Sequence, residues 1–175
     1  LERAGLMGDA AGPIGAIFLA RLRLDGFASL HAGDAVGLVL TRPVIVDGAT
    51  LRVNAQAAGG EIRAEIRDAE SGRAIPGFGL GESLRSRAIA FPDGSVHTRG
   101  GGWGARFEDE TVADDSVAFS GDAVEAPLTW RGGDDLSSLR GRQVRVLFAL
   151  RNADLYSFGF GDPPPHRPAP VGADT

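Results

Sequence analysis

The chain contains no cysteine and no lysine among its 175 residues. Without cysteine there are no disulfide bonds, no cysteine-ligated zinc and no thiol catalysis, while the redox compartment stays open. No apolar run approaches the ~20 residues of a membrane-spanning helix. Residues 1–13 include Glu2 and Asp9 and lack a long apolar stretch, so they do not have the pattern of a signal peptide. We therefore expect no membrane span, and the localisation remains unknown.

Positive charge is also scarce. The chain has 18 arginines and 23 acidic residues, which gives a net charge of −5. Because nucleic-acid-binding proteins usually carry a basic surface, we expect no nucleic-acid partner. Hydrophobic residues make up 43% of the chain, which is enough to bury the core of one domain.

Turn residues, in contrast, are abundant. The 26 glycines and 10 prolines interrupt short apolar segments along most of the sequence. This pattern is typical of many short strands joined by turns. About eight to ten such strands can be counted, and no segment has the pattern of a convincing amphipathic helix. The pattern predicts an all-β fold, an antiparallel two-sheet β-sandwich of the jelly-roll or concanavalin-like kind.

The clearest strands are residues 50–57 and 61–67, which flank Gly59-Gly60. In both segments apolar residues alternate with polar ones, so each has one face for a core. We predict that the two strands form a hairpin. The other face of the second strand carries Glu61, Arg63, Glu65 and Arg67, and we expect this charged face to be solvated.

The remaining elements are weaker, apart from residues 143–151, which form the strongest strand pattern. Further strands are expected at residues 17–24, 27–31, 36–41, 44–46, 123–130 and 155–160, with a helical turn at 135–139. Pro43 marks its neighbourhood as an edge or bulged strand, because proline cannot donate a ladder hydrogen bond. Trp130 ends a patterned strand and is expected in the core.

The domain organisation follows from these segments. Residues 1–16 are expected to be a linker or the end of a preceding domain, and residues 17–160 the β-sandwich domain. A long loop insertion occupies about residues 80–120, where the alternation degrades. Residues 161–175 contain five prolines and are expected to form an extended, mobile tail.

Four segments, taken in order, resemble a known family. They are Arg23-Leu24-Asp25-Gly26-Phe27-Ala28-Ser29-Leu30, Glu65-Ile66-Arg67-Asp68-Ala69 running to Ile75-Pro76-Gly77-Phe78, residues 128–139 around Trp130-Arg131-Gly132-Gly133-Asp134, and residues 144–148 running to Ala153-Asp154-Leu155-Tyr156-Ser157-Phe158. Together they resemble the C-terminal β-sandwich of bacterial glycoside-hydrolase-like proteins. The catalytic part of those proteins is a five-bladed propeller similar to that of β-fructosidases such as invertases and levanases.

This resemblance implies a non-catalytic accessory domain that packs on a catalytic propeller and contacts carbohydrate. It also implies that the segment from Arg23 to Phe27 is the junction with the propeller, so that residues 17–24 would belong partly to the preceding domain. The catalytic carboxylates of the family lie in the propeller, and none is carried over to this chain. The sequence departs from the family pattern between Leu80 and Ser120.

Two alternative functions remain open. A small sandwich glycosidase would need two carboxyl groups facing one sugar. Glu61 and Glu65 share a face, but Arg63 lies between them and would lower their pKa values, which disfavours the role of general acid. The other alternative is a free-standing carbohydrate-binding module, in which an exposed aromatic residue stacks on a sugar ring. Trp103 lies in a glycine-rich stretch with Arg99 and Arg106 nearby, and these three are the candidate carbohydrate-binding residues.

A calcium site is the only cofactor that the sequence suggests. Asp114, Asp115 and Asp122 are its candidate ligands, with Glu125 nearby, because Ca²⁺ is bound by six to eight oxygen atoms that often come from loops. The spacing matches no EF-hand, and an ordinary acidic loop is the simpler interpretation. No catalytic residue is assigned.

Overall fold

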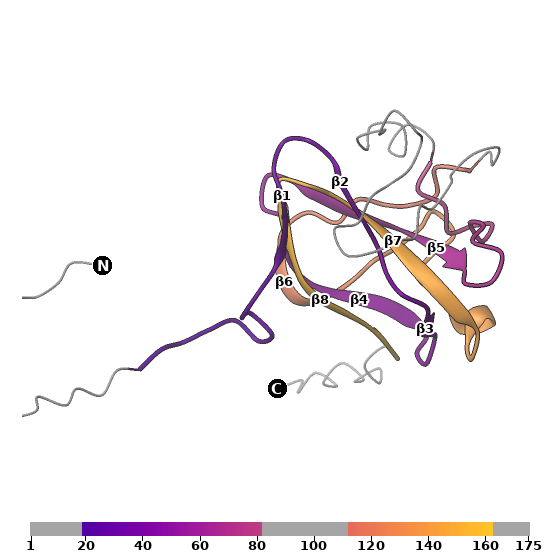
Figure 1. Cartoon of the computed structure of the whole chain (residues 1–175), viewed down its shortest axis with the longest axis horizontal. Helices are drawn as coiled ribbons and strands as arrows, with labels where there is room; N and C mark the ends of the chain where they lie inside the picture. The colour runs from indigo at the N-terminus through magenta and orange to yellow at the C-terminus, as the bar shows by residue number, and fades with distance from the viewer. Residues whose placement is uncertain (1–18, 82–111, 163–175) are drawn as a thin grey trace, which may run out of the picture.

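The computed structural model describes residues 19–81 and 112–162, and its strands form two layers (Figure 1). Within these residues the strands are β1 Leu30–Ala32, β2 Gly37–Leu40, β3 Val44–Ile45, β4 Thr50–Gln56, β5 Glu61–Asp68, β6 Asp122–Pro127, β7 Gln143–Arg151 and β8 Ala153–Gly161. One short 3-10 helix, Ser137–Leu139, confirms the helical turn expected there. In the described part of the chain, no helix is long and apolar enough to cross a membrane.

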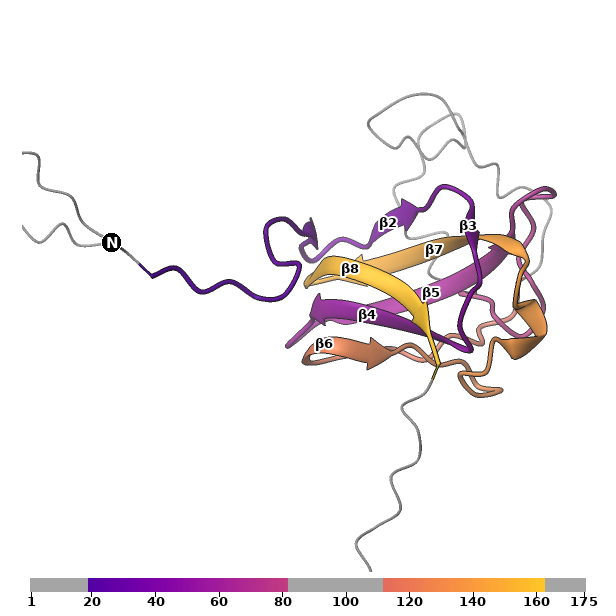
Figure 2. The same cartoon turned by 90° about the horizontal axis from the view of Figure 1, so that it is seen from below.

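The strands form two antiparallel sheets. Sheet A has the order β1-β8-β4-β6, and Figure 2 shows β8, β4 and β6 side by side. In sheet B, β5 pairs with β7 along almost its whole length, so β2 and β3 share the opposite edge of β7. The prediction of an all-β, two-sheet antiparallel sandwich is confirmed, and the edge position expected around Pro43 is confirmed with it. The jelly-roll or concanavalin-like subtype stays a prediction.

The connection between β4 and β5 corrects the sequence analysis. β4 pairs with β6 and β8 in sheet A, whereas β5 pairs with β7 in sheet B. The two strands therefore do not form the predicted hairpin. The chain instead crosses from one sheet to the other at Gly59-Gly60. Alternation shows which side of a strand faces the core, but both sheets of a sandwich face the same core, so alternation does not assign a strand to a sheet.

A second crossing lies directly beside the first. β7 belongs to sheet B and β8 to sheet A, and Asn152 connects them with a positive φ of 45°. The two crossings are in close contact, because a Cβ atom built on Gly60 would lie 2.1 Å from the carbonyl oxygen of Asn152. Only glycine allows this approach of the two backbones.

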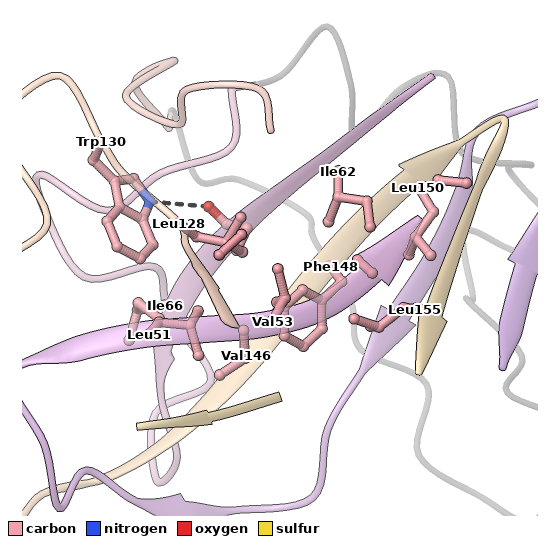
Figure 3. Close-up of a cluster of buried hydrophobic side chains, with 14 of the residues drawn as sticks. Leu51, Val53, Ile62, Ile66, Leu128, Trp130, Val146, Phe148, Leu150 and Leu155 are labelled. Carbon is pink, nitrogen blue, oxygen red and sulfur yellow. Dashed lines mark hydrogen bonds between the residues drawn. The ribbon is translucent and has the colours of Figure 1, made fainter. Parts of the chain in front are cut away.

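The core lies between the two sheets and draws its side chains from both (Figure 3). Leu51 and Val53 of sheet A and Ile62, Ile66 and Phe148 of sheet B are each at most 1% exposed. The ring of Phe148 meets that of Phe158 on β8, with centroids 5.2 Å apart. This aromatic pair joins the two sheets through the core.

Trp130 closes one end of this core, as its sequence context predicted. Its side chain is 3% exposed, and its indole Nε1 donates a hydrogen bond of 2.9 Å to the carbonyl of Ala64 (Figure 3). Phe78 packs edge-on against the indole at 5.2 Å between ring centroids. The buried indole N–H is thereby paired, which is the condition for burying tryptophan without a penalty.

The strand expected at residues 17–24 is absent from its described part, residues 19–24. Leu24 to Phe27 form a turn, and the first strand begins only at Leu30. Leu19 is 98% exposed and Phe27 is 90% exposed. The alternating pattern was real, but no neighbouring strand within the described residues is available to pair with it.

Half of the charged face of β5 is buried and the rest is only partly solvated, which corrects a second expectation. Glu65 is completely buried and Arg67 is 3% exposed. On this outer face of sheet B, Leu80 packs on Leu147 and Ala149 of β7 and forms a second, smaller cluster. The alternation identified the face that points away from the main core, but it contained no information about what lies over that face.

β5 ends in a polar turn that is organised by Asp68. Its Oδ1 accepts hydrogen bonds from the backbone N–H and the hydroxyl of Ser71, both at 2.8 Å, and its Oδ2 meets Arg142 at 3.1 Å. The hydrogen bonds from Ser71, first that of the backbone, lower the pKa of Asp68 from 3.8 to about 2.

A carboxylate whose pKa is lower in the folded than in the unfolded state stabilises the fold above its unfolded pKa. We expect the contribution of Asp68 to be present above about pH 4 and to be lost as the pH falls towards about 2. Urea unfolding between pH 5 and 2 should show that Asp68→Asn loses less stability than the wild type over this interval. Glu70→Gln is the control, because it removes a carboxylate from the same turn but keeps the Ser71 hydrogen bonds. Parallel curves for the wild type and Asp68→Asn would contradict the prediction.

The contact between the two crossings gives a second prediction. Gly60→Ala forces the backbones of Gly60 and Asn152 apart and should destabilise the fold by about 2 kcal/mol or more. Gly132→Ala is the control, because a Cβ atom on Gly132 would meet nothing within 4 Å. Its effect should stay within about 0.5 kcal/mol. Equal unfolding midpoints for the two variants in guanidinium chloride would disprove the role of Gly60.

Candidate functional site

The segment from Arg23 to Phe27, the Arg23 turn, lies against sheet A and is held there by one side chain. The guanidinium of Arg23 donates hydrogen bonds to the side chains of Asn54 and Asp122. It also donates to the carbonyl of Ala55 at 3.1 Å and lies 5.1 Å from the ring centroid of Tyr156. Arg23 thus contacts β4, β6 and β8 at once, with a cation–π contact added to its charge-assisted hydrogen bonds.

The backbone of the Arg23 turn is fixed as well. The side-chain amide of Asn54 donates to the carbonyl of Leu24 at 2.6 Å, and Ser157 donates to the Asp25 carboxylate at 3.1 Å. Asp25 has a positive φ of 52°, and Gly26 N–H closes the turn on the carbonyl of Arg23 at 2.9 Å. Asn54 is 3% exposed, so its hydrogen bond to Leu24 is partly shielded from water, whereas the bond between Ser157 and Asp25 is exposed.

The same turn leaves apolar side chains in solvent. Leu22, Leu24 and Phe27 are 57%, 64% and 90% exposed, and Leu19 just before them is almost fully exposed. The turn is therefore anchored by its polar groups on one side and presents apolar groups on the other. Several large apolar side chains exposed within one short segment favour an interaction surface.

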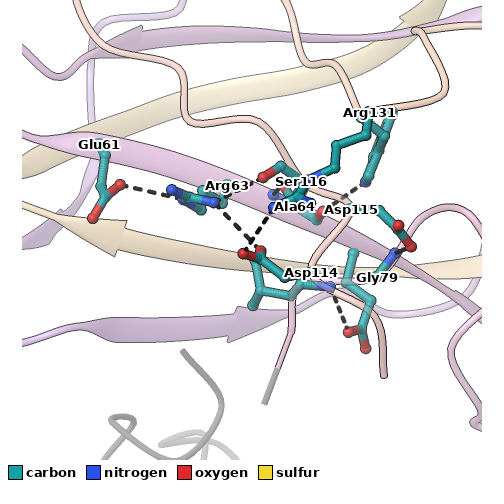
Figure 4. A network of polar contacts seen from close by, with 11 residues as sticks. Glu61, Arg63, Ala64, Gly79, Asp114, Asp115, Ser116 and Arg131 are labelled. Atoms are coloured by element: carbon teal, nitrogen blue, oxygen red, sulfur yellow. Dashed lines mark hydrogen bonds and ion pairs between the residues drawn. The ribbon is translucent and has the colours of Figure 1, made fainter. Parts of the chain in front are cut away.

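Sheet B carries a separate polar network over β5 (Figure 4). Arg63 lies at its centre, 3.2 Å from the Glu61 carboxylate and 3.6 Å from Asp114, and it donates to the carbonyl of Ser116 at 2.8 Å. Arg131 reaches the other oxygen of Asp114 at 3.5 Å. These contacts attach the segment around Ser116 to the edge of β5.

The geometry of Glu61 and Glu65 does not suit a catalytic pair. Glu65 is completely buried, forms an ion pair with Arg67, and accepts a hydrogen bond from the backbone N–H of Leu80 at 3.1 Å. Glu61 is held between Arg63 and Arg151, which lies 3.0 Å away. A glycosidase needs both carboxyl groups against one sugar, and Glu65 is not accessible to one.

The three candidate calcium ligands are not brought together. Asp122 lies on β6 opposite Gln56 of sheet A and binds Arg23. Asp114 and Asp115 belong to the segment beside β5, where Asp115 accepts a hydrogen bond from Gly79 N–H at 3.3 Å. Across residues 19–81 and 112–162, no group of three or more histidine or acidic side chains could hold a metal ion.

The candidate carbohydrate-binding residues Trp103, Arg99 and Arg106 lie outside the described residues, and their role stays a prediction. The roles of Arg23, Asn54 and Tyr156 escaped the sequence analysis. The alternation of residues 50–57 does not show that Asn54 is buried below Arg23, and this position appears only in the structure. The one available signal was the Arg-Leu-Asp-Gly-Phe segment itself, which the family resemblance singled out.

Comparison with known proteins adds no relative: no protein-family model, curated protein or solved structure matches the chain. The fold and the contacts define a class of protein, an all-β sandwich domain with two sheets. Its Arg23 turn is fixed to sheet A and exposes apolar side chains. The particular family suggested by the four segments stays a prediction.

The buried pair of Glu65 and Arg67 gives a prediction on stability. Arg67→Met removes from the buried Glu65 carboxylate a charged partner that is itself buried, and it should cost about 3 kcal/mol or more. The double variant Glu65→Leu/Arg67→Met removes both charges and should recover a large part of this loss. Chemical unfolding of the wild type, both single variants and the double variant measures the coupling. Additive effects of the two substitutions would show that the charges do not act as a pair.

Proposed function

We propose that this chain is a non-catalytic accessory domain of a glycoside-hydrolase-like protein and that it packs on a catalytic propeller through the Arg23 turn. The observation that carries the proposal is the construction of this turn. Arg23 binds three strands of sheet A, while Leu24 and Phe27 point into solvent at 64% and 90% exposure.

A junction between two domains needs both of these properties. Its polar groups must fix the connecting segment on its own domain, because a loose connection allows the two domains to move independently. Its apolar groups must stay exposed on its own domain so that the other domain can cover them, because burying apolar surface is the main favourable contribution to packing. The order of segments that resembles the family assigns the same five residues to the junction.

The ion pairs of β5 support the non-catalytic part of the proposal. Glu65 and Glu61, the only carboxylates considered as a catalytic pair, are bound to arginines within the fold. Their contacts are those of structural residues. Contact with carbohydrate is the finer part of the proposal, and it rests on Trp103, Arg99 and Arg106 of the sequence alone.

The test begins with the coding sequence that precedes Leu1, which should continue in frame into a propeller. In that longer protein, Phe27→Asp should weaken the packing of the two domains, so that calorimetry resolves two separate thermal transitions. Ile45→Asp is the control, because Ile45 is 57% exposed but lies on β3 of sheet B. The isolated chain should release no sugar from β-fructans. An upstream stop codon without a propeller, or sugar release by the isolated chain, would refute the proposal.

A further inference from the structure

A hollow of about 520 Å³ lies on sheet A, beside the Arg23 turn. Leu24 and Asp25 of the turn line one part of it, and the neighbouring strands β8, β4 and β6 (Figure 2) supply the rest. Phe158 and Phe160 of β8 pack on the core, so Gly159 between them faces outward. The hollow therefore lies on the outer face of sheet A, and its volume is within the range of about 300–1,000 Å³ that is usual for small-molecule sites.

The floor of this hollow is bare backbone. A Cβ atom on Gly159 would meet nothing within 4 Å, so no side chain covers this part of β8. Arg52 of β4 lies opposite Gly159 in the sheet, and a Cβ atom on Gly161 would lie 3.4 Å from the Nε atom of Arg52. The two glycines thus leave room for the Arg52 side chain to extend across β8, and they allow a ligand to come close to the backbone beside it.

Two charged side chains of the lining lack a charged partner. Arg52 donates to the carbonyl of Asp162 at 3.4 Å, and in the part of the chain that the structure describes no carboxylate forms an ion pair with it. The side chain of Glu125 on β6 is exposed and forms no hydrogen bond or ion pair with the described residues. The carboxylates of Asp25 and Asp162 are bound by neighbouring side chains. One guanidinium and one carboxylate therefore remain for a ligand.

A larger hollow at the end of β5 differs in this respect. Its volume is about 690 Å³, and its lining includes Asp68, Asp115 and Arg142. Arg142 binds Asp68 at 3.1 Å, and Asp115 accepts a hydrogen bond from the Gly79 N–H. These polar groups would have to give up bonds within the fold before they bind a ligand. The hollow on sheet A is therefore the better candidate for a binding site.

The charges of the lining indicate what kind of ligand fits. An anion that binds Arg52 would be repelled by the carboxylates of Asp25, Glu125 and Asp162, which also line the hollow. A cation that binds Glu125 would be repelled by Arg52 in the same way. A neutral molecule with neighbouring hydroxyl groups suits both, because a hydroxyl donates to a carboxylate and accepts from a guanidinium.

We propose that this hollow binds a neutral carbohydrate. Leu24 and Val124 also line it and are 64% and 40% exposed, so they offer apolar surface to the C–H groups of a sugar ring. The bare backbone at Gly159 lets such a ring lie close to the sheet. The inference gives a site to the carbohydrate contact of the proposed function and rests on that part alone, because packing on a propeller is a separate property.

Calorimetry on the isolated chain tests the inference with neutral oligosaccharides of β-fructan, xylan and cellulose. Galacturonate and glucosamine oligosaccharides are the acidic and basic counterparts. At least one neutral oligosaccharide should bind, and the charged ones should bind more weakly. Glu125→Ala and Arg52→Ala should each weaken the binding about tenfold or more, because each removes a charge-assisted hydrogen bond. Glu70→Ala is the control and should bind like the wild type, because it removes an exposed carboxylate from the turn after β5.

Gly159→Leu tests the position of the ligand. Its new Cβ atom meets nothing in the protein, but the side chain occupies the space above the floor and should abolish binding. Gly132→Leu, at a position equally open to a Cβ atom, should leave binding unchanged. Circular dichroism and thermal melts verify that all variants fold.

Three outcomes would overturn the inference. They are a wild type that binds no neutral oligosaccharide, stronger binding of a charged one, and binding that survives Gly159→Leu but is lost in Trp103→Ala. None of them bears on the packing of the two domains. That part of the proposed function is tested by the upstream coding sequence and by the thermal transitions of Phe27→Asp.

Discussion

The close contact of the two chain crossings sets how the strands of this fold are paired. Gly60 lies against the carbonyl of Asn152 at a distance that no Cβ atom tolerates. Here β4 passes into β5 and β7 passes into β8, each from one sheet to the other. Because both crossings lie together, β5 pairs with β7 and β4 with β8 in long antiparallel ladders. The core is the space that these two ladders enclose.

Each outer face of this sandwich is then used differently. Over sheet B, Leu80 packs on Leu147, and the pair of Glu65 and Arg67 is sealed beneath the covering segment. Over sheet A, a single arginine attaches the Arg23 turn and leaves its apolar groups outside. Burial on one face keeps the Glu65 carboxylate away from any substrate. Exposure on the other explains why a turn with no reactive group is the best candidate for function.

The Arg23 turn contacts β4, β6 and β8 of sheet A through its polar groups and offers apolar side chains to a partner. Packing of exposed apolar side chains suits a partner domain with its own surface. In the proposed function the sandwich is thus a structural module that packs on another domain.

Local sequence patterns were enough to predict the fold class and the location of most strands. Alternation and glycine-rich turns marked residues 143–151 and 155–160 correctly, because period-two burial is a local property of a strand. Trp130 was placed in the core for the same reason. The partner of each strand was decided only by the tertiary structure. Residues 50–57 and 61–67 would alternate identically in a hairpin and in a crossing, and the burial of Glu65 depends on Leu80, fifteen residues further along the chain. The pairing of strands and the burial of a sheet face are contacts between segments that are distant in the sequence, and no local pattern encodes them.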